Sequence, residues 1–287
     1  MDAQAAFDGC AAVINCAGPF VRWGAPVVGA AIAAGVHYVD ISGEQDHLVR
    51  TFAEAHGPAR AAGVTVLPGA NDDALPSDLL AHLVAARVAG RLEELVIAIQ
   101  LSRGAGLPSG GTLRSALANA ESFGGGGVSY LDGQWLGGVP ARRAVMGFGA
   151  EPTPVAPFAL PAVVTVPRHV EARYVGGLAP ADLATQFVAV TPELAEIRGG
   201  DGPSPEERVA SRWTLVVEAV GLDQRPASGA VSGPDTYGLT AVIAVEAARR
   251  LAEDGAPAGV LAPAQAFDPA SFLDALAPHG VRWSVEG

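Results

Sequence analysis

The chain has 287 residues, 49% of them hydrophobic and 17% charged, a composition that disfavours both a disordered chain and a coiled coil. All 18 basic residues are arginine, which excludes a Schiff-base lysine and the lysine of a Walker A phosphate loop. The formal net charge is −12 and the arginines form no basic stripe, so nucleic acid is not an expected partner.

Short apolar strands alternate with helices over the first ninety residues. Helices are predicted over Ala25–Ala34 and Glu44–Ala62, and each ends at a glycine, Gly35 or Gly63, which suits the left-handed backbone after a helix. The predicted strands lie before, between and after these helices, at Ala11–Cys16, Val36–Ile41 and Val64–Leu67. Strands and helices at this spacing indicate βαβ units and a parallel sheet.

The pattern changes after a further helix, predicted from Asp78 to about Val88 and capped by Ser77. Beyond it, short strand-like segments are separated by long connections rich in glycine and proline, which indicates an antiparallel sheet. The segments are Leu95–Leu101, Val128–Leu131, Ala162–Val166 and Trp213–Val220, with a helix capped by Thr112 and ending near Ser122.

The last part of the chain is predicted to be mainly helical. Turn residues dominate Gly221–Asp235, and an apolar helix follows over Thr240–Glu253. Val260–Leu261 is predicted to be a short strand or loop, and Pro269–Leu276 a final helix.

The two cysteines, Cys10 and Cys16, lie in an apolar run, and we expect them to be buried thiols rather than a disulfide or a metal site. The histidines lack metal-ligand spacing, so no metal is expected. The N-terminal residues do not resemble a signal peptide, and no apolar stretch is long enough to cross a membrane. A cytoplasmic location without a transmembrane segment is therefore expected.

The ends of the three predicted parallel strands are the place to look for a ligand site. Small residues dominate the turns that follow the strands, at Asn15–Phe20, Asp40–Glu44 and Pro68–Asp73. A backbone without bulky side chains lets a flat ring or a ribose approach closely. We expect Asn15, Gly18, Gly43 and Gly69 to lie along one sheet edge, at the mouth of one cleft. Ordinary strand-to-helix turns are the alternative interpretation.

Two of these segments carry a family resemblance. Val13–Phe20 and Gly35–Glu44 resemble the central part of saccharopine dehydrogenase-like oxidoreductases, a family that includes trans-acting enoyl reductases of lipid synthesis. The likeness continues in order through three shorter motifs, Pro76–Leu80, Gly111–Ala116 and Tyr237–Ala241. It implies an N-terminal Rossmann domain that binds NAD(P), a mixed α/β second domain that interrupts it, and C-terminal helices that return to the first domain.

Applied to this chain, the resemblance implies an α/β protein with a partial Rossmann domain at residues 1–90, a doubly wound parallel sheet that lacks its first β-α-β unit. A mixed α/β domain with an antiparallel sheet follows at 91–235 for substrate binding and dimerisation, and returning helices occupy 236–287. Because the family's phosphate loop would precede Met1, weak or absent NAD(P) binding is expected. Gly104–Ser109 is a weaker candidate for a phosphate loop, since Pro108 and the glycines after it lengthen the turn.

The strand ends and the resemblance together give the candidate site residues. The expected cofactor contacts are Asn15, Ala17, Gly18, Pro19, Phe20, Gly43 and Gly69. The expected substrate contacts are Glu44, Asp73, Arg114 and Tyr237, and no catalytic residue is identified. Glu44 is expected either to orient a substrate or to serve as a first-turn carboxylate favoured by the helix dipole. Arg114 and Tyr237 are candidates for binding a carboxylate or carbonyl group.

The resulting hypothesis is an NAD(P)-dependent oxidoreductase that transfers hydride to or from an enoyl, imine or carbonyl carbon of a small-molecule substrate. The alternative is a non-enzymatic remnant that binds a lipid-like ligand or a partner subunit. A third interpretation is that translation starts upstream of Met1 and that the full gene product carries the missing β-α-β unit. A homodimer is expected because the uncovered strand edge and the apolar helix Ala25–Ala34 favour association.

Overall fold

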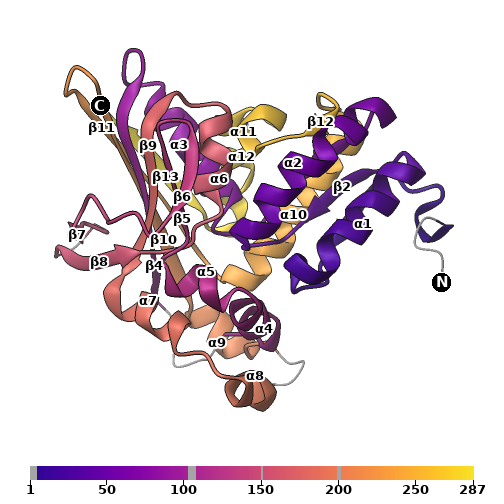
Figure 1. Cartoon of the computed structure of the whole chain (residues 1–287), viewed down its shortest axis with the longest axis horizontal. Helices are drawn as coiled ribbons and strands as arrows, with labels where there is room; N and C mark the ends of the chain where they lie inside the picture. The colour runs from indigo at the N-terminus through magenta and orange to yellow at the C-terminus, as the bar shows by residue number, and fades with distance from the viewer. Residues whose placement is uncertain (1–4, 103–107, 150, 199–201) are drawn as a thin grey trace.

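The computed structural model describes residues 5–102, 108–149, 151–198 and 202–287. They form the predicted α/β protein with a parallel sheet, and the second sheet, predicted to be antiparallel, is mixed (Figure 1). The parallel sheet has the strand order β1-β2-β3-β12, and every neighbouring pair is parallel. Its strands are β1 (Ala12–Asn15), β2 (His37–Asp40), β3 (Thr65–Leu67) and β12 (Gly259–Val260). Within the described chain, β1 forms one edge of this sheet.

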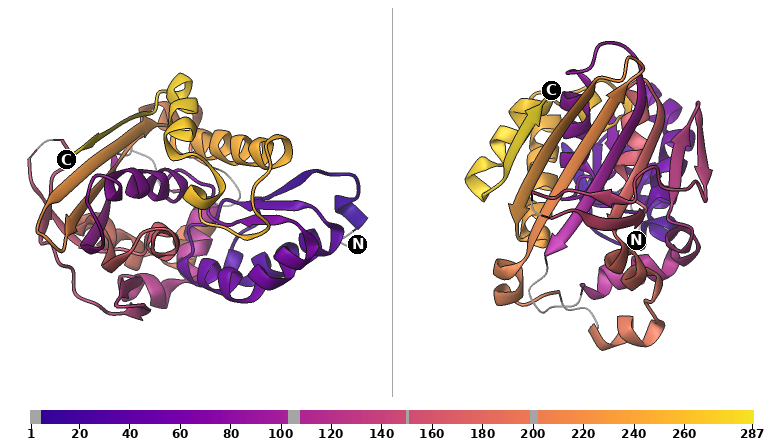
Figure 2. Two further views of the ribbon diagram at one scale, coloured as in Figure 1. Left: turned by 90° about the horizontal axis from the view of Figure 1, so that it is seen from above. Right: turned by 90° about the vertical axis from the view of Figure 1, so that its left-hand side faces the viewer.

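Helices cover both faces of the parallel sheet. Helices α1 (Phe20–Ala34) and α2 (Gln45–Ala62) connect its first three strands and pack against each other. Helix α10 (Thr236–Glu253) contacts β1 and β2 from the opposite side, as the left view of Figure 2 shows. Gly35 and Gly63 end α1 and α2 with φ of 69° and 70°, the left-handed conformation predicted for them.

The second sheet has nine strands and is mostly antiparallel (Figure 2, right). The order is β13-β11-β10-β4-β9-β5-β6, with β8 also paired to β9 and β7 to β8. Only the pair β4–β9 is parallel within it. The bounds are β4 Leu92–Ser102, β5 Val128–Leu131, β6 Gln134–Gly137, β7 Val145–Met146, β8 Thr153–Pro157, β9 Ala172–Pro180, β10 Arg212–Gly221, β11 Pro226–Pro234 and β13 Arg282–Glu286.

Strand β11 shows why part of this sheet could not be predicted. The segment Gly221–Asp235 was expected to be turns, yet β11 pairs with both β10 and β13. A Cβ atom at Gly229 would lie 2.8 Å from the Val84 side chain, and one at Gly233 would lie 2.9 Å from Trp213. The glycines therefore leave room for Val84 and for Trp213 of β10 to pack closely against β11, a tertiary requirement that local propensity does not reveal.

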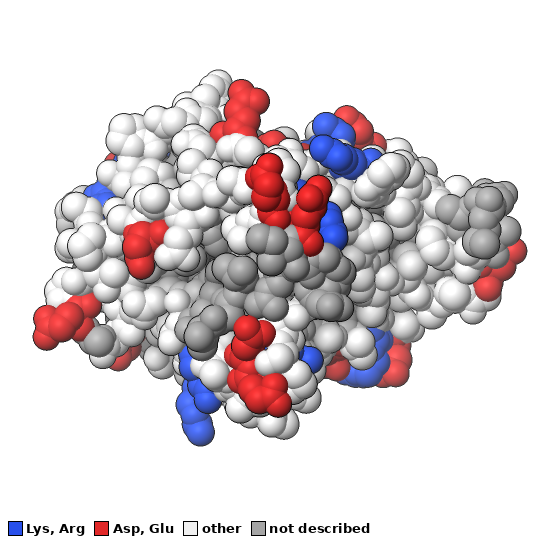
Figure 3. All heavy atoms as spheres, turned by 90° about the horizontal axis from the view of Figure 1, so that it is seen from below, with Lys and Arg blue, Asp and Glu red and all other residues white. Residues whose placement is uncertain are grey.

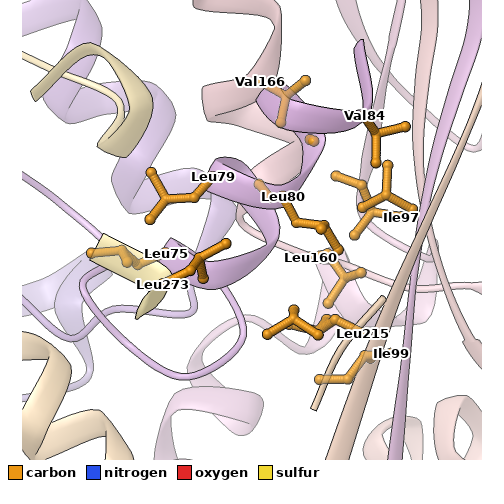
Figure 4. Packing of buried hydrophobic residues seen from close by; sticks show 14 of the residues in the cluster. Leu75, Leu79, Leu80, Val84, Ile97, Ile99, Leu160, Val166, Leu215 and Leu273 are labelled. Carbon is orange, nitrogen blue, oxygen red and sulfur yellow. The ribbon is translucent and has the colours of Figure 1, made fainter. Parts of the chain in front are cut away.

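Helix α3 (Leu75–Ala85) supplies much of the core between the two sheets. It starts before the predicted cap Ser77, because Asn71 Oδ1 accepts a hydrogen bond from the Ala74 N–H at 2.7 Å and so ends the preceding turn earlier. Leu80 and Val84 of α3 lie toward Ile97 in Figure 4. Although α3 falls within residues 1–90, it packs against β10 and β11 of the second sheet. The domain boundary near residue 90 stays a prediction.

The other helices lie around the second sheet and at the end of the chain. They are α4 Gly110–Ala118, α5 Ala120–Gly124, α6 Ala162–Thr165, α7 Ala181–Val188, α8 Pro192–Arg198, α9 Pro205–Ala210, α11 Pro263–Ala266 and α12 Pro269–Ala275. Short 3₁₀ helices are η1 Ala5–Phe7, η2 Val166–Arg168 and η3 Ala277–His279. Ala162–Val166, predicted as part of an antiparallel sheet, is thus helical. It is buried on all sides, and a short apolar run of this kind does not distinguish strand from helix.

Three smaller predictions are also corrected. Ser109, not Thr112, caps α4, because its Oγ accepts a hydrogen bond from the Thr112 N–H at 3.1 Å. Cys10 and Cys16 are exposed rather than buried, because both lie just outside β1. Helix α1 begins at Phe20 rather than Ala25, because the Glu44 carboxylate accepts hydrogen bonds from the N–H groups of Phe20 and Val21.

The described helices and surface charges bear on possible contact with a membrane. None of the helices in the described ranges combines the length and apolar character needed to cross a bilayer. On the face drawn in Figure 3, acidic side chains form several separate groups and arginines are fewer among the residues that are described.

Candidate functional site

A cavity of about 360 Å³ lies where the carboxyl ends of the parallel strands meet the second sheet. All three strand-to-helix turns contribute to it, through Gly18 after β1, Gly43 after β2 and Asp73 after β3. Ile99 and Leu101 of β4 line the opposite side. The cavity therefore occupies the position at which open α/β sheets bind their ligands.

The structure brings about half of the predicted site residues into this cavity. The predicted residues that line it are Gly18, Phe20, Gly43, Glu44, Asp73 and Tyr237. The predicted residues that do not line it are Asn15, Ala17, Pro19, Gly69 and Arg114. Arg114 is an exposed residue of α4. The cofactor and substrate roles of all these residues stay predictions.

Glu44 is buried between two helices and caps the first of them. Its two carboxylate oxygens accept hydrogen bonds from the backbone N–H groups of Phe20 and Val21, at 2.9 and 2.8 Å. These are amides at the start of α1, where N–H groups lack partners within the helix. Residue 44 is 24 positions away in sequence, so this cap, which starts α1 at Phe20, was not recognisable from local pattern.

Replacing Glu44 with alanine is expected to lower the free energy of unfolding by about 1–3 kcal/mol, because two buried N–H donors lose their acceptor. Urea unfolding followed by circular dichroism measures this loss. Glu54→Ala, at an exposed position of α2, serves as the control and should change stability by less than about 0.5 kcal/mol. Equal effects of the two substitutions would show that the Glu44 cap does not stabilise α1.

A buried carboxylate, Asp40, organises the turns beneath the cavity. Its Oδ1 accepts hydrogen bonds from the N–H groups of Ser42 at 3.0 Å and Gly69 at 2.9 Å. Its Oδ2 accepts one from the Tyr38 hydroxyl at 2.9 Å and lies 2.7 Å from His47 Nε2. Asp40 is fully buried and His47 is 2% exposed, so the pair is shielded from water. Asp40 thus links the turn after β2 to the turn after β3.

Asn15 and Tyr38 extend this hydrogen-bond network to the turn after β1. Asn15 Nδ2 donates to the Tyr38 hydroxyl at 3.0 Å, and Asn15 Oδ1 accepts from the Ala17 N–H at 3.0 Å. Burial, assisted by the charge of Asp40, raises the pKa of Tyr38, so this hydroxyl stays protonated and can donate to the carboxylate. Asn15, Ala17 and Gly69, predicted as cofactor contacts, therefore belong to the network that supports the turns.

Sequence reasoning missed the central pair of this network. Asp40 was included only as the start of a turn, and His47 was set aside as a helical histidine without ligand spacing. An acidic residue at the buried end of an apolar strand was the one available signal, because such a charge needs partners. Which residues would supply the partners depends on the fold.

Asp73 is the ionisable side chain of the cavity whose environment is most unusual. One of its carboxylate oxygens, Oδ1, is buried and has no hydrogen-bond partner among the described residues. Burial raises the pKa of Asp73 from 3.8 to about 6, although a hydrogen bond from Asn71 acts in the opposite direction. A carboxyl group with this pKa can exchange a proton near neutral pH.

Tyr237 connects the cavity to the start of α4. Its hydroxyl oxygen accepts a hydrogen bond from the Ser109 N–H at 2.8 Å and lies 3.2 Å from the Thr112 hydroxyl. Tyr237 is therefore held against the end of the loop that was considered as a second phosphate loop. Most of that loop, residues 104–107, lies outside the described residues.

Three phenylalanines form an aromatic wall of the cavity. The ring centres of Phe123, Phe158 and Phe187 lie 5.2 to 5.7 Å from one another, in tilted or edge-to-face arrangements. Together with Ile99 and Leu101 they make this side of the cavity apolar. The side formed by the strand ends is polar, so the cavity can hold a ligand with one apolar and one polar part.

Two arginines that line the cavity donate hydrogen bonds to other groups of the protein. Arg208 forms two hydrogen bonds with the carboxylate of Asp235, at 2.9 and 2.7 Å. Arg212 donates to the backbone carbonyls of Val209 and Ser211.

Within the described ranges, no group of three or more histidine, cysteine or acidic side chains has an arrangement suited to a metal ion.

Comparisons with known proteins support the resemblance found in the motifs. The chain is 37% identical over 67 residues to a probable mitochondrial saccharopine dehydrogenase-like oxidoreductase of Arabidopsis thaliana, and 32% identical over 109 residues to a putative trans-acting enoyl reductase of Mycobacterium tuberculosis. It is similar to saccharopine dehydrogenase-like oxidoreductases. These alignments cover 23% and 37% of this chain, but only 15% and 26% of the two relatives. No family model matches the chain.

The fold of this chain is also found in a solved structure. Apo saccharopine dehydrogenase (L-Glu forming) from Saccharomyces cerevisiae superposes with a TM-score of 0.55 at 13% sequence identity. The superposition covers 99% of this chain and 87% of the yeast chain. The predicted fold class and the predicted family resemblance are thus confirmed.

Proposed function

We propose that the chain is an NAD(P)-dependent oxidoreductase of the saccharopine dehydrogenase-like type, which transfers hydride to or from an enoyl, imine or carbonyl carbon. The observation that carries the proposal is the position of Asp73, a carboxyl group with a pKa of about 6 that lines a cavity at the carboxyl ends of parallel strands. Perturbed ionisable groups in such cavities are candidates for proton transfer. The sequence similarity to oxidoreductases supports the same class of reaction.

The cavity suits the nicotinamide end of the cofactor. Phe20 offers an aromatic ring and Ile41 an aliphatic side chain. Gly43 leaves its part of the wall free of a side chain, and Asn71 places an amide nearby. These residues would hold the ring and its carboxamide. Bound NAD(P)H would supply the hydride.

The start of α1 does not suit the pyrophosphate. Helix N-termini bind phosphate through free N–H groups, and the first two N–H groups of α1 are already bonded to Glu44. Glu44, Asp72 and Asp73 also make this side of the cavity acidic. These observations support weak binding of NAD(P) by the chain as given, with the phosphate contacts to be supplied from outside the described residues.

Asp73 is proposed to move the proton that accompanies hydride transfer. When hydride adds to one carbon of a C=C, C=N or C=O bond, the other atom gains an electron pair and must accept a proton. Protonated Asp73 can donate it, and the carboxylate can take it back in the reverse reaction. Asp73 is half-buried and lines the cavity, which places its carboxyl group beside a bound substrate.

The aromatic wall supports a substrate with a largely apolar body. Phe123, Phe158 and Phe187 contact one another and leave their outer surfaces to the cavity. A fully charged amino-acid substrate would gain little from this wall, because burying its charges away from partners costs free energy. An acyl chain or an aromatic group would be stabilised there.

The test is the NADPH-dependent reduction of a panel of enoyl thioesters, imines and ketones, followed by nicotinamide absorbance. Asp73→Asn is expected to lower kcat by about 10²–10⁴-fold, the usual contribution of a general acid or base. Asp72→Asn is the matched control. Asp72 is the adjacent carboxylate of the same cavity, and unlike Asp73 Oδ1 its Oδ1 accepts a hydrogen bond, from Thr240 Oγ1 at 2.9 Å. Equal losses in both variants would contradict the role of Asp73.

A second candidate function is a non-enzymatic remnant that holds a lipid-like ligand. The aromatic wall and the occupied N-terminus of α1 favour it, because both suit an apolar ligand better than a dinucleotide. Saturable binding of a fluorescent fatty acid, together with no binding of NADPH, would support this alternative. A cytoplasmic location and a homodimer also stay predictions.

A further inference from the structure

A second groove lies apart from the cavity and shares no lining residue with it. It is an open groove of about 590 Å³ between α2, the hairpin of β5 and β6, and the segment after β12. Its wall includes Phe52 and His56 of α2, Tyr130 and Trp135 of the hairpin, and Arg168 at the end of η2. None of the residues that line the groove is acidic.

Arg168 is held between aromatic rings in this groove. Its guanidinium carbon lies 3.5 Å from the ring centre of Phe52 and 5.2 Å from that of Trp135. The backbone at Arg168 is fixed by Gln265, whose Nε2 donates to the Arg168 carbonyl oxygen at 3.0 Å. The cation–π contacts orient the planar group but supply no acceptor for its N–H donors.

The guanidinium of Arg168 lacks an anionic partner. Its Nε is buried and has no hydrogen-bond partner among the described residues, and it takes part in none of the ion pairs found between them. Burial lowers its pKa to about 10, so the group remains charged at neutral pH.

We propose that this groove binds a small organic anion, a carboxylate or a phosphate monoester, through Arg168. The planar guanidinium offers parallel N–H donors that match either group. Tyr130 and Trp135, whose rings lie edge to face 5.3 Å apart, form an apolar surface beside it for a ring or short chain. Arg168 is half-buried and lines the groove, so the anion would accept hydrogen bonds from its accessible N–H groups rather than from the buried Nε.

The competing explanation is that Arg168 only covers Phe52 and the apolar cluster beneath it. Long arginine side chains often cover apolar surface in this way. A purely covering role requires no ligand and predicts no dependence on the charge of an added molecule. The two explanations therefore differ in binding, not in stability alone.

The test uses phenyl phosphate and benzoate as probes of the full-length chain, with inorganic phosphate for the charge alone and benzyl alcohol for the ring alone. Binding is followed by isothermal calorimetry and by the fluorescence of Trp135, with Trp135→Phe used to assign the signal. At least one ring-bearing anion is expected to bind saturably and at least tenfold more tightly than benzyl alcohol. The stronger of phenyl phosphate and benzoate identifies the preferred anionic group.

Arg168→Gln is expected to weaken this binding at least tenfold, whereas Arg168→Lys should retain part of it. Arg225→Gln removes a charge from an exposed ion pair with Asp223 and should leave binding unchanged. Thermal melting of each variant shows whether it is folded, and the lysine variant keeps the charge if the glutamine variant unfolds. Undiminished binding to a folded Arg168→Gln variant, or no saturable binding of either ring-bearing anion to the unaltered chain, would overturn the proposal.

Discussion

Replacing Asp40 with alanine is expected to lower the free energy of unfolding by about 3–5 kcal/mol, because several buried hydrogen-bond donors lose their acceptor at once. Asp40 is fully buried and accepts hydrogen bonds from Ser42, Gly69 and Tyr38 in addition to its contact with His47. All four partners would lose their acceptor together. Urea unfolding of the variant measures the loss.

Asp46→Ala, next to His47 in the sequence but exposed, is the control for Asp40 and should cost no more than about 1 kcal/mol through the helix dipole. Because Asp40 joins the turns that line the cavity, ligand binding should weaken in the Asp40 variant even under conditions where it is folded. A loss of stability similar to that of Asp46→Ala would mean that the network does not hold the turns.

The second large effect concerns pH. The pKa of Asp73 is raised by burial from 3.8 to about 6, so its charged form is costly in the folded protein. Its contribution favours folding below pH 4 and is lost as pH rises through 6. Asp73→Asn should therefore be more stable than the unaltered chain above pH 6, by about 1–3 kcal/mol, since one unit of pKa corresponds to about 1.4 kcal/mol.

Urea unfolding of Asp73→Asn and of the unaltered chain between pH 4 and 8 checks this pH dependence. The difference in stability should shrink below pH 6 and disappear near pH 4. A difference that is constant across this range would show that the pKa of Asp73 is not raised. A gain in stability that accompanies a loss of activity would be the usual cost of placing a charged group in a functional cavity.

The parallel sheet could be predicted because its signals are local. The apolar strands, and the glycines that end α1 and α2, follow from residues that are neighbours in sequence. The strand ends then indicated the right region for the cavity, since parallel strands place their carboxyl ends at one edge. Gly18, Gly43 and Asp73 line the cavity for this reason.

The remaining features depend on contacts between distant residues. The cap that Glu44 places on α1, and the pairing of Asp40 with His47, arise only when the chain has folded. The sequence of β11 resembles a turn because it is rich in glycine, and two of these glycines leave room for the side chains of Val84 and Trp213. Propensity and periodicity do not reveal such contacts. The sequence could therefore place Glu44 near the site without showing that it caps α1.

The groove around Arg168 also depends on contacts between distant residues. Its aromatic and basic residues come from α2, the β5–β6 hairpin and η2, segments that are far apart in the sequence. No local motif marks it. If it binds an anion, the chain has two ligand sites on separate parts of its surface, and occupation of one can be measured without the other.

The most direct test of the cavity as a cofactor site is a titration of NADPH, followed by nicotinamide fluorescence, with Gly43→Leu. A Cβ atom at Gly43 meets only Asn71 Nδ2, at 3.6 Å, and Gly43 lines the cavity, so the rest of a leucine side chain would take up space that a ligand needs. Gly29→Leu, at an exposed position of α1, is the control. We predict that Gly43→Leu weakens NADPH binding at least tenfold and that Gly29→Leu leaves it unchanged. Unaltered NADPH binding by a folded Gly43→Leu variant would contradict the account.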